Sequence, residues 1–131
     1  MKRVFVDSNY LIDYLRRHAY TKHLIEKIQS RQIEAYISVV TVLELYVGAL
    51  LSNNHSKRFE DVETLLSWFQ IVDVNKEIML AAAKINVDLR KRGLMVGIQD
   101  ILIAASSIST NTPLITNNTK HFQKIEGIRL E

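Results

Sequence analysis

The chain has 131 residues, no cysteine, a net charge of +3 and 47% hydrophobic residues. This length predicts a single domain, residues 1–131, with a sizeable core. The lack of cysteine excludes a disulfide framework, thiolate zinc and a cysteine nucleophile, and it fits a reducing cytoplasm. No apolar run reaches the roughly 18 residues that span a bilayer, so we expect no membrane partner. The mild charge permits a polyanionic partner without predicting one.

The hydrophobic pattern predicts short strands that alternate with helices. In chain order we expect a strand at residues 3–6, helices at 9–17 and 20–31, and a strand at 35–38. Thr41 or Ser38 then opens a helix that reaches residue 51, and a helix at 57–69 and a strand at 70–74 follow. The last elements are helices at 76–92 and 98–109 and strands at 113–116 and 128–130. Ser8 and Asn75 are the expected N-caps of two of these helices. Gly93 is expected to end the helix that Asn75 begins.

This alternation predicts an α/β fold with a mostly parallel central sheet and helices on both faces. In such sheets the ligand site lies beyond the carboxyl ends of the strands. Asp7 directly follows the first strand, and residues 116–118 follow the strand after the helix of Asp100. We therefore expect these positions to meet at one edge of the sheet.

Two acidic residues stand alone in long segments without other charges. Glu44 is the only charged residue in 35–56, and Asp100 is the only one in 93–119. A carboxylate in apolar surroundings is costly to desolvate unless a positive group meets it. If the fold brings both together with Asp7, the three acids repel one another until a cation binds. The pattern predicts a metal site built from oxygen ligands.

Each acid also has a purely structural interpretation. Asp7 can serve as a helix cap or turn residue, and Glu44 can be partly exposed on a helix whose other faces are buried. Asp100 lies in the first helical turn, where the helix dipole favours a carboxylate. Taken together, however, all three occupy positions that face one site under one fold.

Other charged residues are more typical of a surface. Asp13 precedes Arg16 and Arg17 by three and four residues, which predicts a surface ion pair. The basic run 90–92 predicts a helix end that complements the dipole, with phosphate binding as the alternative. The role of His121 stays open.

Four motifs carry a resemblance to a known family. They are Val-Phe-Val-Asp-Ser-Asn at 4–9, Ser-Val-Val-Thr-Val-Leu-Glu-Leu at 38–45 with Gly48, Gln-Asp-Ile-Leu-Ile-Ala-Ala at 99–105, and Leu-Ile-Thr-Asn-Asn at 114–118 with Phe122. In this order they make essentially the whole chain resemble the PIN-domain ribonucleases, and most of all the VapC-type toxins of type II toxin–antitoxin pairs.

The resemblance implies a PIN-like three-layer sandwich and a cytoplasmic endoribonuclease that depends on Mg²⁺ or Mn²⁺. It implies that Asp7 and Asp100 are the principal metal ligands, and that Glu44 binds the metal directly or through water. Asn9 and Thr116 resemble the polar residues that steady the site.

The chain departs from the family pattern at one position. Many members carry a fourth acid where this chain has Asn118, with His121 nearby. An amide oxygen can accept a hydrogen bond but carries no charge, so we expect a second metal ion to bind more weakly.

The resemblance also implies an RNA substrate, a cognate antitoxin that covers the acidic cleft, and a homodimer. Apolar residues that could belong to such interfaces are Leu50, Leu51, Leu65, Trp68 and Phe69, for most of which an ordinary place in the core is favoured.

Two rival functions remain open. The first is a small-molecule phosphatase with Asp7 as nucleophile, although position 9 is Asn where the best-known motif of that class has an acid. The second is a non-catalytic nucleic-acid-binding or scaffold domain, which the missing fourth acid favours and the three retained acids oppose.

Overall fold

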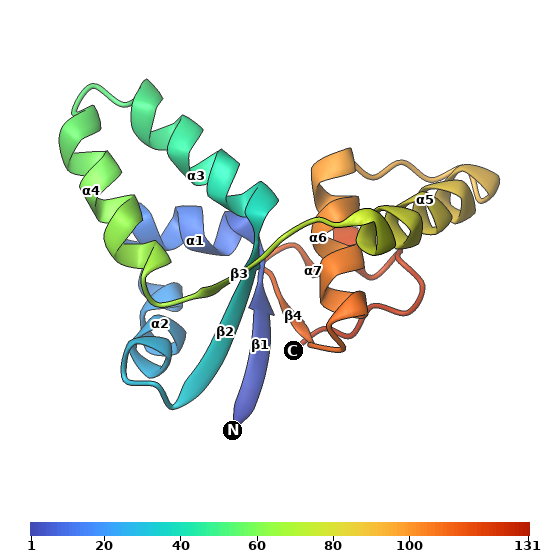
Figure 1. The fold of residues 1–131 in the computed structure, drawn as a ribbon, viewed down its shortest axis with the longest axis horizontal. Helices are drawn as coiled ribbons and strands as arrows, with labels where there is room; N and C mark the ends of the chain where they lie inside the picture. Colours follow the sequence, from blue (N-terminus) through green and yellow to red (C-terminus); the bar gives the residue numbers. More distant parts are fainter.

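A four-stranded sheet forms the centre of the computed structural model, which describes residues 1–131 (Figure 1). The strands are β1 (Lys2–Val6), β2 (Ile33–Ser38), β3 (Gln70–Val72) and β4 (Leu114–Ile115). Their order is β3-β2-β1-β4, and all three neighbouring pairs are parallel. The predicted α/β fold with a mostly parallel sheet is thus confirmed.

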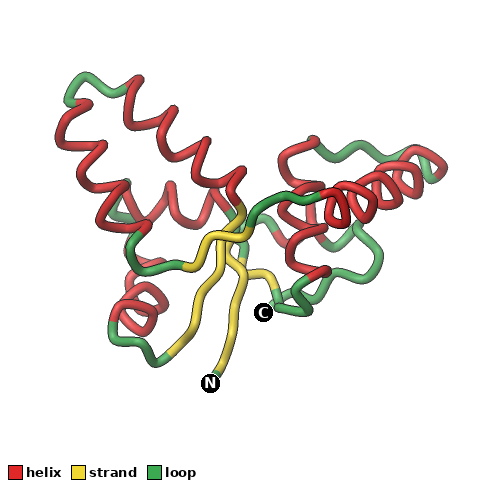
Figure 2. The backbone as a smooth tube through the Cα atoms, viewed as in Figure 1, coloured by secondary structure: helices red, strands yellow, loops and turns green.

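Helices cover both faces of this sheet (Figure 2). They are α1 (Ser8–Leu15), the 3₁₀ helix η1 (Ala19–Thr21), α2 (Lys22–Gln29), α3 (Val39–Leu51), α4 (His55–Leu66), α5 (Lys76–Lys91), α6 (Ile98–Ser109) and α7 (Thr119–Phe122). None of them combines the length and apolar character needed to cross a membrane.

The alternation of side chains along β1 divides the core in two. Val4 and Val6 pack into the cluster formed with α1 to α4, whereas Phe5 packs into the cluster formed with α5, α6 and α7. Successive strand residues point to opposite faces, so one buried strand supports both layers. The expected three-layer arrangement follows from this pattern.

The first helix begins one residue before its predicted start. Asp7 is its N-cap, with an extended backbone (φ −71°, ψ 148°), and Ser8 is already helical. The Ser8 hydroxyl therefore does not cap the helix and contacts α3 instead. The prediction of Ser8 as a cap was wrong because both residue types suit that position equally well.

Element ends account for the other differences. The helix predicted at 57–69 ends at Leu66, because the chain turns there towards β3 and the Ser67 hydroxyl binds the Thr64 carbonyl. The strand predicted at 128–130 is reduced to one bridge between Leu114 and Leu130.

We predict that Asn75→Ala lowers the free energy of unfolding by about 1 kcal/mol. The Asn75 side-chain oxygen accepts a hydrogen bond from the Ile78 N–H at 2.9 Å, as expected for an N-cap of α5. Urea denaturation compared with Asn53→Ala, in an exposed turn, measures the difference. Equal stabilities of the two variants would contradict the prediction.

Candidate active site

The Asp7 carboxylate lies at the carboxyl end of β1 and is fully buried. Its Oδ2 accepts a hydrogen bond from the Thr116 hydroxyl at 2.8 Å, whereas its Oδ1 has no hydrogen-bond partner. Thr116 directly follows β4, the strand that pairs with β1. A buried polar atom without a partner is rare in folded proteins, so this oxygen points to an absent ligand.

Burial is the main cause that raises the pKa of Asp7 from 3.8 to about 6. The negative charges of Asp100 and, to a smaller extent, Glu44 raise it further, while the hydrogen bond from Thr116 opposes the increase. The three acids that stand out in the sequence therefore lie close enough to repel one another.

Glu44 reaches this region from α3. Its Oε1 accepts a hydrogen bond from the Ser8 hydroxyl at 2.9 Å, and Ser8 Oγ also lies 2.7 Å from Thr41 Oγ1. These contacts join the first turn of α1, next to Asp7, to α3. Burial and then the charge of Asp100 raise the pKa of Glu44.

Asp100 lies in the first turn of α6, as the sequence predicted. Its Oδ2 is 2.9 Å from Nε2 of His121, which belongs to α7. Both side chains are partly exposed. The structure thus places the imidazole of His121, whose role the sequence left open, in contact with Asp100.

The remaining two predicted site residues make weaker connections. The backbone N–H of Asn118 donates to the Thr116 hydroxyl at 2.9 Å, but its side chain is exposed. Asn9 is exposed and its side chain makes no hydrogen bond. A steadying role for Asn9 therefore stays a prediction.

Asp13 does not form the predicted ion pair with Arg16 or Arg17. Its carboxylate accepts hydrogen bonds from the Tyr20 hydroxyl and from Asn117 Nδ2, the latter at 2.6 Å. Local spacing predicted a neighbour on the same helix, whereas the actual partners lie on η1 and on the segment after β4. No sequence signal distinguishes these cases.

The basic run 90–92 mostly binds its own helix. Arg90 Nε donates to Asn86 Oδ1 at 2.5 Å, and Arg92 binds Asp88 at 2.6 Å and the carbonyl of Lys124. The interpretation of a charged helix end fits these contacts.

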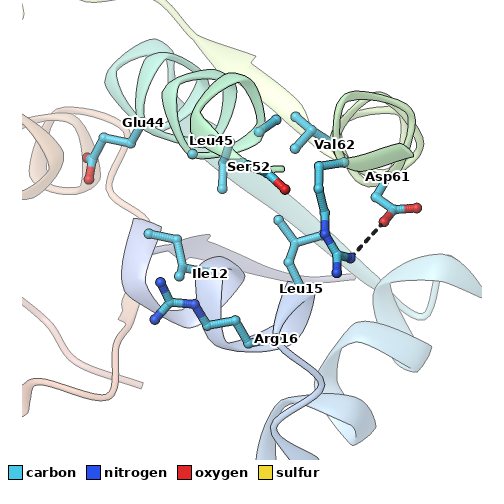
Figure 3. Close-up of a pocket in the computed structure, with 11 residues that line it drawn as sticks. Ile12, Leu15, Arg16, Glu44, Leu45, Ser52, Asp61 and Val62 are labelled. Atoms are coloured by element: carbon cyan, nitrogen blue, oxygen red, sulfur yellow. Dashed lines mark hydrogen bonds and ion pairs between the residues drawn. The ribbon is translucent and has the colours of Figure 1, made fainter. Parts of the chain in front are cut away.

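A groove of about 410 Å³ lies between α1, α3 and α4, and Glu44 is the one of the three acids that lines it (Figure 3). Glu44 and Arg16 both line it, and Figure 3 shows their charged ends on the same side. Arg58, across the groove, is paired with Asp61 at 3.4 Å. The apolar part of the lining consists of Ile12, Leu15, Leu45, Ala49 and Val62.

The residues at this edge of the sheet fit a hard divalent cation. They offer carboxylate oxygens, including the unpartnered Oδ1 of buried Asp7. No group of three His, Asp or Glu side chains already forms a complete ligand set. Mg²⁺ commonly binds through one or two carboxylates, with water and substrate phosphates as its other ligands, so a complete set is not required.

Comparison with known proteins agrees with this fold. The PIN domain family matches residues 4–128. The chain is 30% identical to "Ribonuclease VapC1" of Methanocaldococcus jannaschii over 129 residues, which cover 98% of this chain and 85% of that protein. It is 28% identical to "tRNA(fMet)-specific endonuclease VapC" of Salmonella typhimurium over 131 residues, covering 100% and 98% of the two chains.

Solved structures show the same relationship. The chain superimposes with a TM-score of 0.90 and 26% identity on a chain of DNA-bound VapBC from Salmonella typhimurium, covering 100% of this chain and 98% of the other. It matches a chain of VapBC-1 from nontypeable Haemophilus influenzae with a TM-score of 0.84 and 29% identity, covering 98% and 96%. The chain therefore belongs to the PIN-domain family and, within it, to the VapC ribonucleases.

Proposed function

We propose that the protein is the toxin of a toxin–antitoxin pair and hydrolyses RNA phosphodiester bonds with the help of Mg²⁺ or Mn²⁺. The observation that carries this proposal is the unpartnered Oδ1 of Asp7, buried beside two further acids. A binding site for nucleic acid alone gains nothing from a buried, repelled carboxylate, whereas a cation relieves both penalties.

Asp7 and Asp100 would hold the cation, with Glu44 as a third ligand directly or through water. When bound, the cation supplies positive charge that makes water a better nucleophile and stabilises charge on the phosphoryl oxygens. Thr116 occupies one oxygen of Asp7 and so orients the other. Ser8 does the same for Glu44, whose second oxygen can orient the attacking water.

Single-stranded or loop RNA is the proposed substrate. The relative from Salmonella typhimurium is named as a tRNA(fMet)-specific endonuclease, so tRNA belongs among the RNAs to be tested. Glu44 and Asp100 are partly exposed at the sheet edge beside buried Asp7, and this exposure is compatible with a long polymer. We also propose a cytoplasmic location, because the relatives are named as a ribonuclease and a tRNA endonuclease.

The partners we propose are an antitoxin and a second copy of the chain. The similar solved structures are of VapBC toxin–antitoxin assemblies. The groove beside Glu44 combines an apolar lining with the positive charge of Arg16, which suits an antitoxin segment. For the homodimer we propose the exposed apolar face of α3 formed by Leu43, Val47, Leu50 and Leu51. Leu65 and Phe69, by contrast, are buried core residues.

We predict that Asp100→Asn lowers the rate of RNA cleavage by more than about 100-fold, because it removes one charged cation ligand. Cleavage of a panel of tRNAs and unstructured RNAs in Mn²⁺ or Mg²⁺ measures this, with EDTA as a second control. Asp88→Asn, which alters only an exposed ion pair with Arg92, should cleave like the parent. Parent-like cleavage by Asp100→Asn would show that the site is assigned wrongly.

We predict that Asp7→Asn stabilises the metal-free protein at neutral pH. Because the folded state raises the pKa of Asp7 from 3.8 to about 6, the parent loses stability as the pH rises through this interval. The loss is absent below pH 4 and complete above pH 6, where it amounts to roughly 1–3 kcal/mol.

Urea denaturation in EDTA at pH 4 and pH 7.5 measures this difference. The variant should exceed the parent in stability at pH 7.5 and match it more closely at pH 4. A variant that is less stable at pH 7.5 would refute the role of buried charge.

We predict that Mn²⁺ raises the melting temperature of the parent by roughly 10 °C at a hundred times its Kd. Differential scanning fluorimetry measures the shift, and Asp7→Asn should lose most of it. A non-catalytic scaffold would show no shift at any concentration of Mn²⁺.

A further inference from the structure

One segment after β4 makes polar contacts with two of the acids. We call residues 116–121 the rim segment. Thr116 donates to Asp7 at its beginning, and His121 lies 2.9 Å from Asp100 at its end. A displacement of the rim segment would therefore alter both carboxylates together.

The rim segment has few internal contacts that could hold it in place. Between Thr116 and His121, all four residues are exposed. The N–H of Asn118 binds the Thr116 hydroxyl at 2.9 Å, which fixes only the turn itself. Ile115, which pairs with β1, fixes the beginning of the segment, and buried Phe122 fixes the residue that follows its end. The exposed turn between them depends on side-chain contacts with other elements.

Asn117 makes those contacts. Its Nδ2 donates to Asp13 Oδ2 at 2.6 Å and to the Tyr20 hydroxyl oxygen at 2.9 Å. The Tyr20 hydroxyl in turn donates to Asp13 Oδ2. The three side chains form a closed triangle of hydrogen bonds that joins α1, η1 and the rim segment, although they are separated by up to 104 residues in sequence.

The base of this triangle packs against α1, with the Tyr20 side chain half-exposed. The Asp13 side chain is only 18% exposed, and the Tyr20 ring packs edge-on against buried Tyr10 with centroids 5.4 Å apart. Burial and then the neighbouring carboxylate of Asp13 raise the pKa of Tyr20 to about 12. The hydroxyl therefore stays protonated and leaves its oxygen free to accept from Asn117.

The Asp13 carboxylate binds a residue at the edge of the candidate active site and not its neighbours in sequence. Arg16 and Arg17 follow Asp13 at spacings that would favour ion pairs on a continuous helix. However, α1 ends at Leu15, and the carboxylate of Asp13 binds the amide of Asn117. The only basic side chain paired with Asp13 is His18, whose Nδ1 lies 3.8 Å from Asp13 Oδ1. Asp13 thus accepts a hydrogen bond from Asn117, the residue that follows Thr116 in sequence.

We propose that Asp13 and Tyr20 are positioning residues of the active site, which bind Asn117 and thereby hold Thr116 against Asp7 and His121 against Asp100. This inference rests on the proposed function, since it assigns the two residues a role in holding the cation through Asp7 and Asp100. Residues that orient metal ligands typically change metal affinity or activity by 10- to 100-fold when they are removed.

The test uses three variants of the full chain. Asp13→Asn removes the charge, Tyr20→Phe removes a single hydroxyl, and Asn117→Ala removes the shared donor. Tyr46→Phe is the matched control, because the Tyr46 hydroxyl also binds an acid, Glu63 at 3.2 Å, but between α3 and α4. Tyr20→Phe also serves as the mildest variant if Asp13→Asn fails to fold.

Mn²⁺ affinity, measured by calorimetry, is the first readout. Asn117→Ala and Asp13→Asn should each weaken Mn²⁺ binding by about 10-fold, and their combination should weaken it little further because both break one triangle. kcat for RNA should fall by about 10- to 100-fold while KM changes less. Tyr46→Phe should stay within about 2-fold of the parent in every readout.

Amide hydrogen exchange in EDTA is the second readout, and it is independent of the cation. Exchange of the Asn118 N–H should accelerate by about 10-fold or more in Asn117→Ala and in Asp13→Asn, but not in Tyr46→Phe. Parent-like exchange at Asn118, or parent-like Mn²⁺ affinity in Asn117→Ala, would overturn the inference. A parent that binds no Mn²⁺ would refute the proposed function, and faster exchange at Asn118 would then still support the positioning of the rim segment.

Discussion

The burial of one carboxylate at the end of a strand is the constraint on which the rest of this site depends. β1 delivers Asp7 into a position without solvent access, and only one of its two oxygens finds a donor. Desolvation raises its pKa, and the nearby charges of Asp100 and Glu44 add to that effect. The folded chain thus carries an electrostatic cost that a bound cation would remove.

The parallel sheet is what makes this arrangement possible. The order β3-β2-β1-β4 places β4 next to β1, so that Thr116 meets Asp7 across 109 residues of sequence. The same edge receives the beginnings of α1, α3 and α6, which carry Ser8, Glu44 and Asp100 within or near their first turns. Hydrogen-bond donors and acids therefore converge without any one segment containing the site.

The departure at Asn118 changes the character of this edge. Where the resemblance leads one to expect a fourth acid, this chain has an exposed amide, and the imidazole of His121 contacts Asp100. The site has less negative charge to repel the phosphates of an RNA chain. Asn117 joins the rim segment to Asp13 and Tyr20 through hydrogen bonds. The polar residues of this segment therefore contribute to its position as well as to the chemistry of the site.

The lone acids Glu44 and Asp100 were recognisable in the sequence because a carboxylate within a long apolar segment is costly to desolvate. The alternation of strands and helices also predicted the parallel α/β fold, since each side-chain period is a local property. Local patterns did not predict that Ser8 would bind Glu44, that His121 would contact Asp100, or that Asp13 would bind Asn117 in place of Arg16. These contacts span 21 to 104 residues, and only the packing of distant elements decides which polar group each side chain meets.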